Sequence, residues 1–184
     1  QPELRRGLAR LGQFGMVLKE ENVVDEVIKA VTVLSKKKIG ALVAIEREVG
    51  LRSYIESGIP LYSKVTSELI NTIFMPNTPL HDGGIIIENG SIASAGCLFP
   101  LSQDPRLSKT MGMRHRAAIG LSEETDAVVI VVSEETGVIS VSIAGRLTRD
   151  MDKESLSKVL DNLFGREKKE KPVFSFFRKK HVEN

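Results

Sequence analysis

The sequence predicts an α/β domain with a central mixed β-sheet flanked by helices, and three observations carry this prediction. Continuous apolar runs at residues 41–45 and 127–133 have the length of buried strands. Amphipathic stretches at residues 23–37 and 152–164 have helical periodicity. Hairpin signals make part of the sheet antiparallel, and the glycine-rich nucleotide fingerprints are absent, so neither a Rossmann nor a P-loop fold is expected.

Composition places most of the chain in one domain. With 184 residues and 41% hydrophobic residues, the chain can fill one core, and we assign residues 1–165 to it. Residues 166–184 hold seven Lys or Arg against three Glu, which leaves 19 basic and 21 acidic side chains elsewhere. We expect a disordered basic tail there and do not expect the body to bind nucleic acid. The single cysteine, Cys97, excludes an internal disulfide, and its apolar neighbours predict a buried thiol in a cytosolic domain.

The first half of the chain is predicted to alternate between helices and strands. Residues 2–12 and 23–37 are expected to form helices, and residues 41–45 the first buried strand. Residues 47–63 are mixed in character, so we expect short irregular pieces there. A helix is predicted at 66–74, before prolines that force an extended loop.

The second half contains the clearest local signal, a hairpin. Asn89-Gly90 lies between two runs typical of strands and predicts a type I′ turn. Further on, we expect a helix at 117–121, strands at 127–133 and 138–143, and a last helix at 152–164.

The first candidate motif is PLHDGG at residues 79–84, directly before a predicted strand. Two consecutive glycines, Gly83 and Gly84, permit a close approach of backbone to ligand. Asp82 is a candidate metal ligand or proton acceptor, and His81 a candidate second ligand. An ordinary Asp-Gly turn entering a strand is the alternative interpretation.

The second candidate motif, Arg114-His115-Arg116, lies at the start of a predicted helix. A helix N-terminus carries partial positive charge, so arginines there are unfavourable unless an anion lies between them. Because guanidinium groups match phosphate oxygens in pairs, the motif predicts a polyphosphate site, with a solvated basic turn as the alternative. Ser133 and Glu135 end a buried strand and are candidates for a phosphate and a divalent cation, unless they form only a polar turn.

Together these motifs resemble the bacterial diadenylate cyclase (DAC) domain. The family pattern is Asp-Gly-Ala before a strand and Arg-His-Arg about thirty residues later, and it is matched by residues 82–84 and 114–116. The resemblance spans roughly residues 1–165 and implies the DAC-domain fold. The first six residues resemble the segment after the membrane helices in the membrane-anchored (CdaA-type) branch. Gly84 replaces the usual Ala, and Met113 replaces a Thr that often precedes the second motif.

The resemblance implies a reaction and a set of roles. Two ATP molecules would be joined into cyclic di-AMP with release of two pyrophosphates, at two sites that face each other in a homodimer. Catalytic roles would fall to residues of the two motifs, namely Asp82, Gly83, Arg114, His115 and Arg116. ATP-binding roles would fall to Gly84, Leu98, Phe99, Met113 and Ser133, and a divalent metal (Mn²⁺ or Mg²⁺, with Co²⁺ a further option) to Asp82, His81 and Glu135.

Two other functions stay open at this stage. Gly84 and Met113 are the features that favour a non-catalytic nucleotide sensor, and the basic tail is the feature that favours a nucleic-acid-binding module. The resemblance also implies that the full-length protein is anchored in the cell membrane through a missing N-terminal region, with this domain on the cytosolic side.

Overall fold

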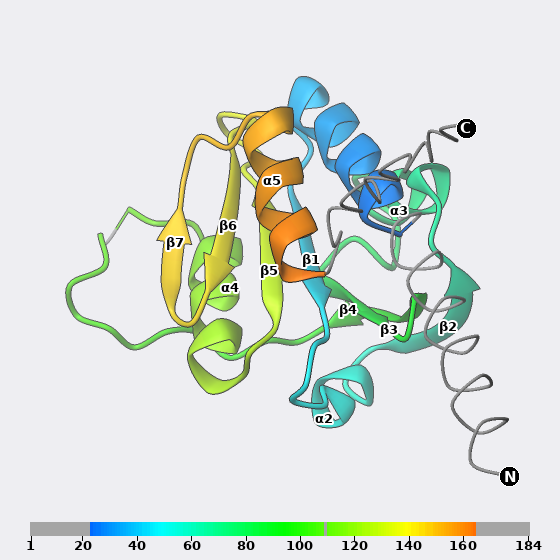
Figure 1. Cartoon of the computed structure of the whole chain (residues 1–184), viewed down its shortest axis with the longest axis horizontal. Coiled ribbons are helices and arrows are strands. Elements are labelled where there is room, and N and C mark those ends of the chain that lie inside the picture. The colour runs from blue at the N-terminus through cyan, green and yellow to red at the C-terminus, as the bar shows by residue number, and fades with distance from the viewer. Residues whose placement is uncertain (1–22, 109, 165–184) are drawn as a thin grey trace, which may run out of the picture.

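The computed structural model describes residues 23–108 and 110–164, and its centre is a mixed seven-stranded sheet (Figure 1). The strands are β1 (Ala41–Ile45), β2 (Ile59–Lys64), β3 (Gly84–Glu88), β4 (Ser91–Cys97), β5 (Val128–Val132), β6 (Ile139–Ile143) and β7 (Arg146–Thr148). Their order across the sheet is β2-β4-β3-β1-β5-β6-β7. Only the β1–β3 pair is parallel, so the predicted mixed sheet is confirmed.

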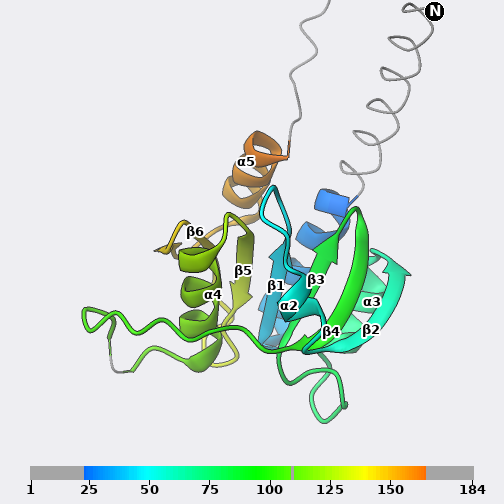
Figure 2. The ribbon, with the colours of Figure 1, turned by 90° about the horizontal axis from the view of Figure 1, so that it is seen from below.

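Helices cover both faces of the sheet (Figure 2). One face packs against the helix at residues 23–37, α3 (Ser67–Ile73) and α5 (Lys153–Leu163), and the other against α2 (Arg52–Ile55) and α4 (Met113–Glu124). Central strands therefore lose the alternation of a half-exposed strand, and all five residues of β1 and of β5 are buried. Each fully buried Val, Leu or Ile contributes about 1.5–3 kcal/mol by leaving water.

The prediction for residues 47–63 was wrong, because this segment contains α2 and most of the edge strand β2. β2 pairs with β4 alone, and its residues are largely exposed, so the strand has no apolar pattern to read. Pro60 is tolerated because an edge strand has unpaired amide positions. The short strand β7 was likewise not predicted, since only one of its three residues is even half-buried.

Three local predictions are confirmed. Asn89 and Gly90 have φ of 48° and 73°, which is the type I′ geometry, and they join β3 to β4. The last helix begins after Asp152, whose carboxylate accepts a hydrogen bond from Ser155 N at 2.7 Å. The helix predicted at 117–121 is longer, because α4 begins at Met113 and places the whole Arg-His-Arg motif in its first turn.

Several expectations fall outside the described residues, namely the helix at 2–12 and the tail at 166–184. Across the described part, no helix is both long and apolar enough to cross a bilayer. Cys97 is buried as predicted, and burial raises the pKa of its thiol despite the contact with Ser94 Oγ at 2.7 Å.

Candidate active site

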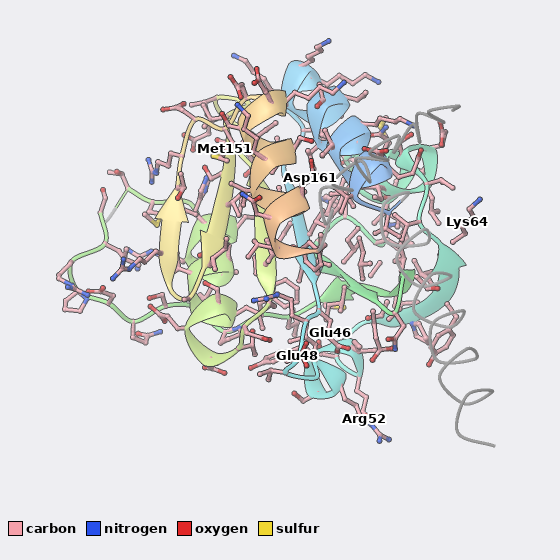
Figure 3. All side chains as sticks on the ribbon, viewed as in Figure 1. Glu46, Glu48, Arg52, Lys64, Met151 and Asp161 are labelled. Atoms are coloured by element: carbon pink, nitrogen blue, oxygen red, sulfur yellow. The ribbon has the colours of Figure 1, made fainter. Side chains whose placement is uncertain are left out.

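A cavity of about 590 Å³ lies at one end of the sheet, and both sequence motifs contribute to its wall. It lies where β5 ends, where β6 begins and where β7 leads into α5, the end marked by Met151 in Figure 3. The residues that line it from the predicted set are Asp82, Gly83, Leu98, Phe99, Met113, Arg114, His115, Ser133 and Glu135. Two motifs about thirty residues apart in the chain therefore share one cavity.

Tight backbone contact positions Asp82. The next residue, Gly83, has φ of +124°, and a Cβ there would lie 2.7 Å from the Gly96 carbonyl carbon. Only glycine permits both the dihedral angle and the contact. The Asp82 side chain is exposed and makes no hydrogen bond to other described residues, so its carboxylate is available to a ligand.

Arg114 reaches across the cavity to the turn after β5. Its Nη1 donates to Glu134 Oε2 at 2.7 Å, and the pair lies over Gly40, where a Cβ would meet Arg114 Nη1 at 2.8 Å. Its Nε is buried with no hydrogen-bond partner among the described residues. A buried N–H without an acceptor costs about 1–3 kcal/mol, and the Arg114 side chain that bears it lines the cavity.

His115 follows Arg114 in the first turn of α4 and is half-buried. Burial lowers the pKa of its imidazole below the ordinary value of 6.5, and the charge of Arg149 lowers this pKa further. His115 is therefore neutral at pH 7 and able both to donate and to accept a hydrogen bond.

Arg116, the third residue of the motif, does not line the cavity. Its Nη2 donates to Ser108 O at 3.0 Å, and its own carbonyl accepts from Ser102 N at 3.0 Å. Both contacts hold the long connection between β4 and α4, which supplies Leu101, Thr110 and Met111 to the cavity wall. Arg116 thus stabilises the connection that forms part of the cavity wall, without lining the cavity itself.

Phe99 and Leu98 form an apolar wall. Phe99 is buried and meets Tyr54 edge-to-face, with ring centroids 6.3 Å apart, whereas Leu98 is largely exposed. Gly84 lies behind this wall and outside the cavity lining, and a Cβ at Gly84 would approach the Phe99 ring to 2.6 Å. The Gly84 departure from the family pattern and the bulk of Phe99 are thus sterically coupled.

The remaining predicted residues occupy different places. Ser133 Oγ accepts from Thr136 N at 3.3 Å, which leaves its own hydroxyl proton to donate into the cavity. Met113 and Glu135 line the cavity and are exposed. His81 does not line it, and its Nδ1 lies 2.5 Å from Thr78 O. Because a carbonyl only accepts, Nδ1 is the donor in this contact.

The chemistry of the available donors fits a divalent cation shared with a ligand better than a cation held by protein alone. Among the described residues, no group of three or more His, Cys, Asp or Glu is arranged to hold a metal ion. Carboxylates of Asp82, Glu134 and Glu135 nevertheless line the cavity. Mg²⁺ is commonly bound by one or two carboxylates together with substrate phosphates, and this set supplies the protein's part.

Sequence reasoning missed Arg149, Ser140 and Leu42, which also line the cavity. Leu42 is part of a buried strand whose apolar run gives no sign of which residue faces a ligand. Ser140 is similarly buried in β6, and Arg149 follows a strand that was not predicted. Only knowledge of the β6–β7 pairing brings Ser140 and Arg149 to the two motifs.

A helix N-terminus without a side-chain cap, beside Arg114 at one end of a mixed α/β sheet, is typical of proteins that bind phosphorylated ligands. The comparison with protein families makes the class specific. The model of the "DisA bacterial checkpoint controller nucleotide-binding" family matches residues 28–147. The chain belongs to this family, the DAC family, as the two motifs had indicated.

Individual relatives agree with this assignment. The chain is 48% identical over 172 residues to cyclic di-AMP synthase CdaA of Bacillus subtilis, covering 89% of this chain and 63% of the relative. It is 48% identical over 168 residues to a diadenylate cyclase of Listeria monocytogenes, covering 87% and 62%. The chain therefore spans somewhat less than two thirds of the length of these relatives.

Two solved structures share the fold. A cysteine double mutant of DacA from Staphylococcus aureus has a TM-score of 0.77 and 47% identity, covering 79% of this chain and 97% of that chain. A hypothetical membrane spanning protein from Bacillus cereus has a TM-score of 0.67 and 41% identity, covering 70% and 63%. The mixed sheet with flanking helices is thus the DAC-domain fold.

Proposed function

We propose that the protein is a diadenylate cyclase, a nucleotidyltransferase that condenses two ATP molecules into cyclic di-AMP and two pyrophosphates. The observation that carries the proposal is the single cavity that both family motifs line, with the exposed Asp82 and the cationic Arg114 on its wall. Relatives named as cyclic di-AMP synthase or diadenylate cyclase match almost nine tenths of the chain.

Each of the two reaction steps forms one bond and breaks another. The 3′-oxygen of one ATP bonds to the α-phosphorus of the other, the bond from that phosphorus to the β-phosphate oxygen breaks, and pyrophosphate leaves. Asp82 accepts the proton of the attacking hydroxyl. Arg114 and the first turn of α4 neutralise phosphate charge, while Ser133 donates to the triphosphate and neutral His115 orients the chain of phosphates.

The adenine is placed against the apolar wall of Leu98 and Phe99. Gly83 and Gly84 allow the loop that carries Asp82 to pass close to β4 and to the Phe99 ring, as their neighbours indicate. Arg116 keeps the β4–α4 connection in place through Ser108 O. These residues position the substrate without touching the reacting atoms.

A divalent cation, Mn²⁺ or Mg²⁺ with Co²⁺ as a further option, is part of the proposal. Asp82 and Glu135 would hold it from this cavity, whereas His81, the third predicted ligand, does not line the cavity. Bound there, the cation supplies charge neutralisation on the phosphates and lowers the pKa of the attacking hydroxyl.

Two copies of the chain are required, because one cavity holds one ATP and the product contains two adenylates. The proposed active form is a homodimer with two cavities facing each other across a two-fold axis. The full-length protein is proposed to be held at the membrane with this domain in the cytosol, as its relatedness to CdaA and to a membrane spanning protein supports.

The direct experiment is incubation with ATP and Mn²⁺ or Mg²⁺, followed by chromatography of the products. We expect one cyclic di-AMP and two pyrophosphates for each two ATP consumed. The rate should rise more steeply than linearly with protein concentration in the range where dimers form. ATP binding without any product would favour the nucleotide-sensor alternative, and a strictly linear rate down to a demonstrably monomeric range would remove the facing dimer.

A further inference from the structure

The far wall of the cavity carries a cation and a hydroxyl that belong to neither sequence motif. Arg149 directly follows β7, and Ser140 lies in β6. Both line the same cavity as Asp82 and Arg114. No role in the reaction proposed above requires either residue, so their placement calls for a separate explanation.

The register of the sheet brings these two side chains together. β6 and β7 pair Val141 with Thr148, and continuing this antiparallel register by one step places Arg149 opposite Ser140. The chain stays beside β6 there, because Met151 N donates to Ile139 O at 3.0 Å. Directly opposed residues project from the same face of a sheet with Cβ atoms about 4.5–5.5 Å apart. The pair is therefore held by two neighbouring strands.

Both groups lack partners inside the protein. Ser140 has no exposed surface, and its Oγ has no hydrogen-bond partner within the described part of the chain. Arg149 is exposed and forms no ion pair with any described residue, although Asp150 and Glu135 lie on the same cavity wall. By contrast, Nη1 of Arg114 donates to Glu134 Oε2, and Nη2 of Arg116 donates to Ser108 O.

The first turn of α4 completes an anion site. It has no side-chain cap and no acidic residue, and its N-cap is Gly112. The amides of His115 and Arg116 donate to Gly112 O, whereas those of Met113 and Arg114 precede them and have no partner within the helix. The helix dipole adds partial positive charge at that point. Met113, Arg114 and His115 of this turn line the same cavity as Arg149 and Ser140.

We propose that Arg149 and Ser140 bind the β- and γ-phosphates of the nucleotide, the part that leaves as pyrophosphate, opposite the N-terminus of α4. This inference deepens the proposed function and rests on it. Asp82 and the apolar wall hold the adenosine and α-phosphate end, while the β6–β7 pair holds the leaving group. Charge that develops on the departing pyrophosphate is neutralised by a guanidinium that no protein carboxylate occupies.

The test measures binding of three probes separately to the purified chain: 3′-deoxy-ATP, which lacks the attacking hydroxyl, inorganic pyrophosphate, and AMP. For Arg149→Gln, we expect the Kd of 3′-deoxy-ATP and of pyrophosphate to rise about tenfold, as loss of one charge-assisted contact predicts. The Kd of AMP should stay within about twofold of the parent protein, because AMP lacks the phosphates that Arg149 contacts.

Arg146→Gln is the matched control, since Arg146 is exposed on the same short strand and does not line the cavity. All three dissociation constants should be unchanged in that variant. Ser140→Ala provides a second variant that keeps the core volume. It should weaken pyrophosphate binding about fivefold without lowering the melting temperature, because it removes a hydroxyl that has no protein partner.

Unchanged pyrophosphate binding in Arg149→Gln would overturn the inference, and so would an equal loss of AMP and 3′-deoxy-ATP affinity, which would indicate a structural role. Failure of the proposed function looks different. In that case the parent chain makes no cyclic di-AMP from ATP, while pyrophosphate binding still depends on Arg149.

Discussion

The two ends of the sheet use the same residue types in opposite ways. At the end of β1, labelled by Glu46 and Glu48 in Figure 3, carboxylates hold a loop. Asp126 accepts from Glu48 N at 3.1 Å and from Val49 N at 3.0 Å, and Glu46 accepts from Leu51 N at 2.7 Å. The carboxylates of Asp126 and Glu46 accept hydrogen bonds from backbone amides, so they stabilise the loop.

At the cavity end, several polar groups have no hydrogen-bond partner within the described residues. Asp82 has no hydrogen bond within the described residues, the Nε of Arg114 has no acceptor there, and Ser140 is buried without a partner. A buried group without a partner costs stability, and both Arg114 and Ser140 line the cavity, as does the exposed Asp82, which favours a ligand at this end of the sheet. Variants that act at one end only can therefore test the distinction.

The largest effect on folding is expected for Gly83→Ala at the cavity end. A methyl group there would lie 2.7 Å from the Gly96 backbone at a φ of +124°, which lowers the free energy of unfolding by about 3 kcal/mol. Gly50→Ala is the control, because a Cβ there meets nothing within 4 Å. Thermal melts measure both, and a loss for Gly83→Ala no larger than for Gly50→Ala would show that the close approach is not rigid.

A smaller effect is expected for Gly84→Ala, which restores the usual residue of the family motif. Its methyl group would meet the Phe99 ring at 2.6 Å and destabilise the fold by about 1–2 kcal/mol. Phe99→Leu should relieve the clash, so the double variant is expected to be more stable than the two separate losses predict. Urea unfolding of all four proteins gives this coupling, and simple additivity would show that Phe99 moves aside freely.

The smallest effect is the pH dependence that His115 adds. Its folded-state pKa is lower than in the unfolded chain, so the unfolded state binds more protons between the two values. The stability from neutral His115 is therefore present above pH 6.5 and is lost as the pH falls through the folded pKa. Thermal melts in EDTA between pH 7.5 and 5.5 should show a steeper loss for the parent than for His115→Gln. Parallel curves for the two proteins would contradict the prediction.

Much of the fold could be predicted from the sequence because its core is built from unambiguous elements. The buried run of β1, the Asn89-Gly90 turn and the helix α5 each follow from local chemistry. The edge strands β2 and β7 could not be predicted, because exposed strands depend on pairing with a neighbour rather than on an apolar pattern.

The same contrast between local signals and strand pairing applies to the residues of the candidate site. Asp82 and Arg114 stand in short motifs. Arg114 was found because arginines at a helix N-terminus conflict with the helix dipole, and Asp82 because two glycines after it permit a close approach to a ligand. Ser140 and Arg149 were missed, because only the register of two strands carries them to the cavity. Arg116 was recognised as part of the motif, but its contact with Ser108 O could not be foreseen from spacing.

The most direct test of the central claim is the rate of cyclic di-AMP formation by Asp82→Asn, measured beside its ATP affinity. With a saturating divalent cation, the rate should fall about a hundredfold or more, since general base catalysis contributes at least that much. The ATP dissociation constant should stay within about threefold of the parent, because Arg114 and the α4 N-terminus remain in place. Glu48→Gln, at the opposite end of the sheet, should leave both quantities unchanged. Parent-level product formation by Asp82→Asn would contradict the account.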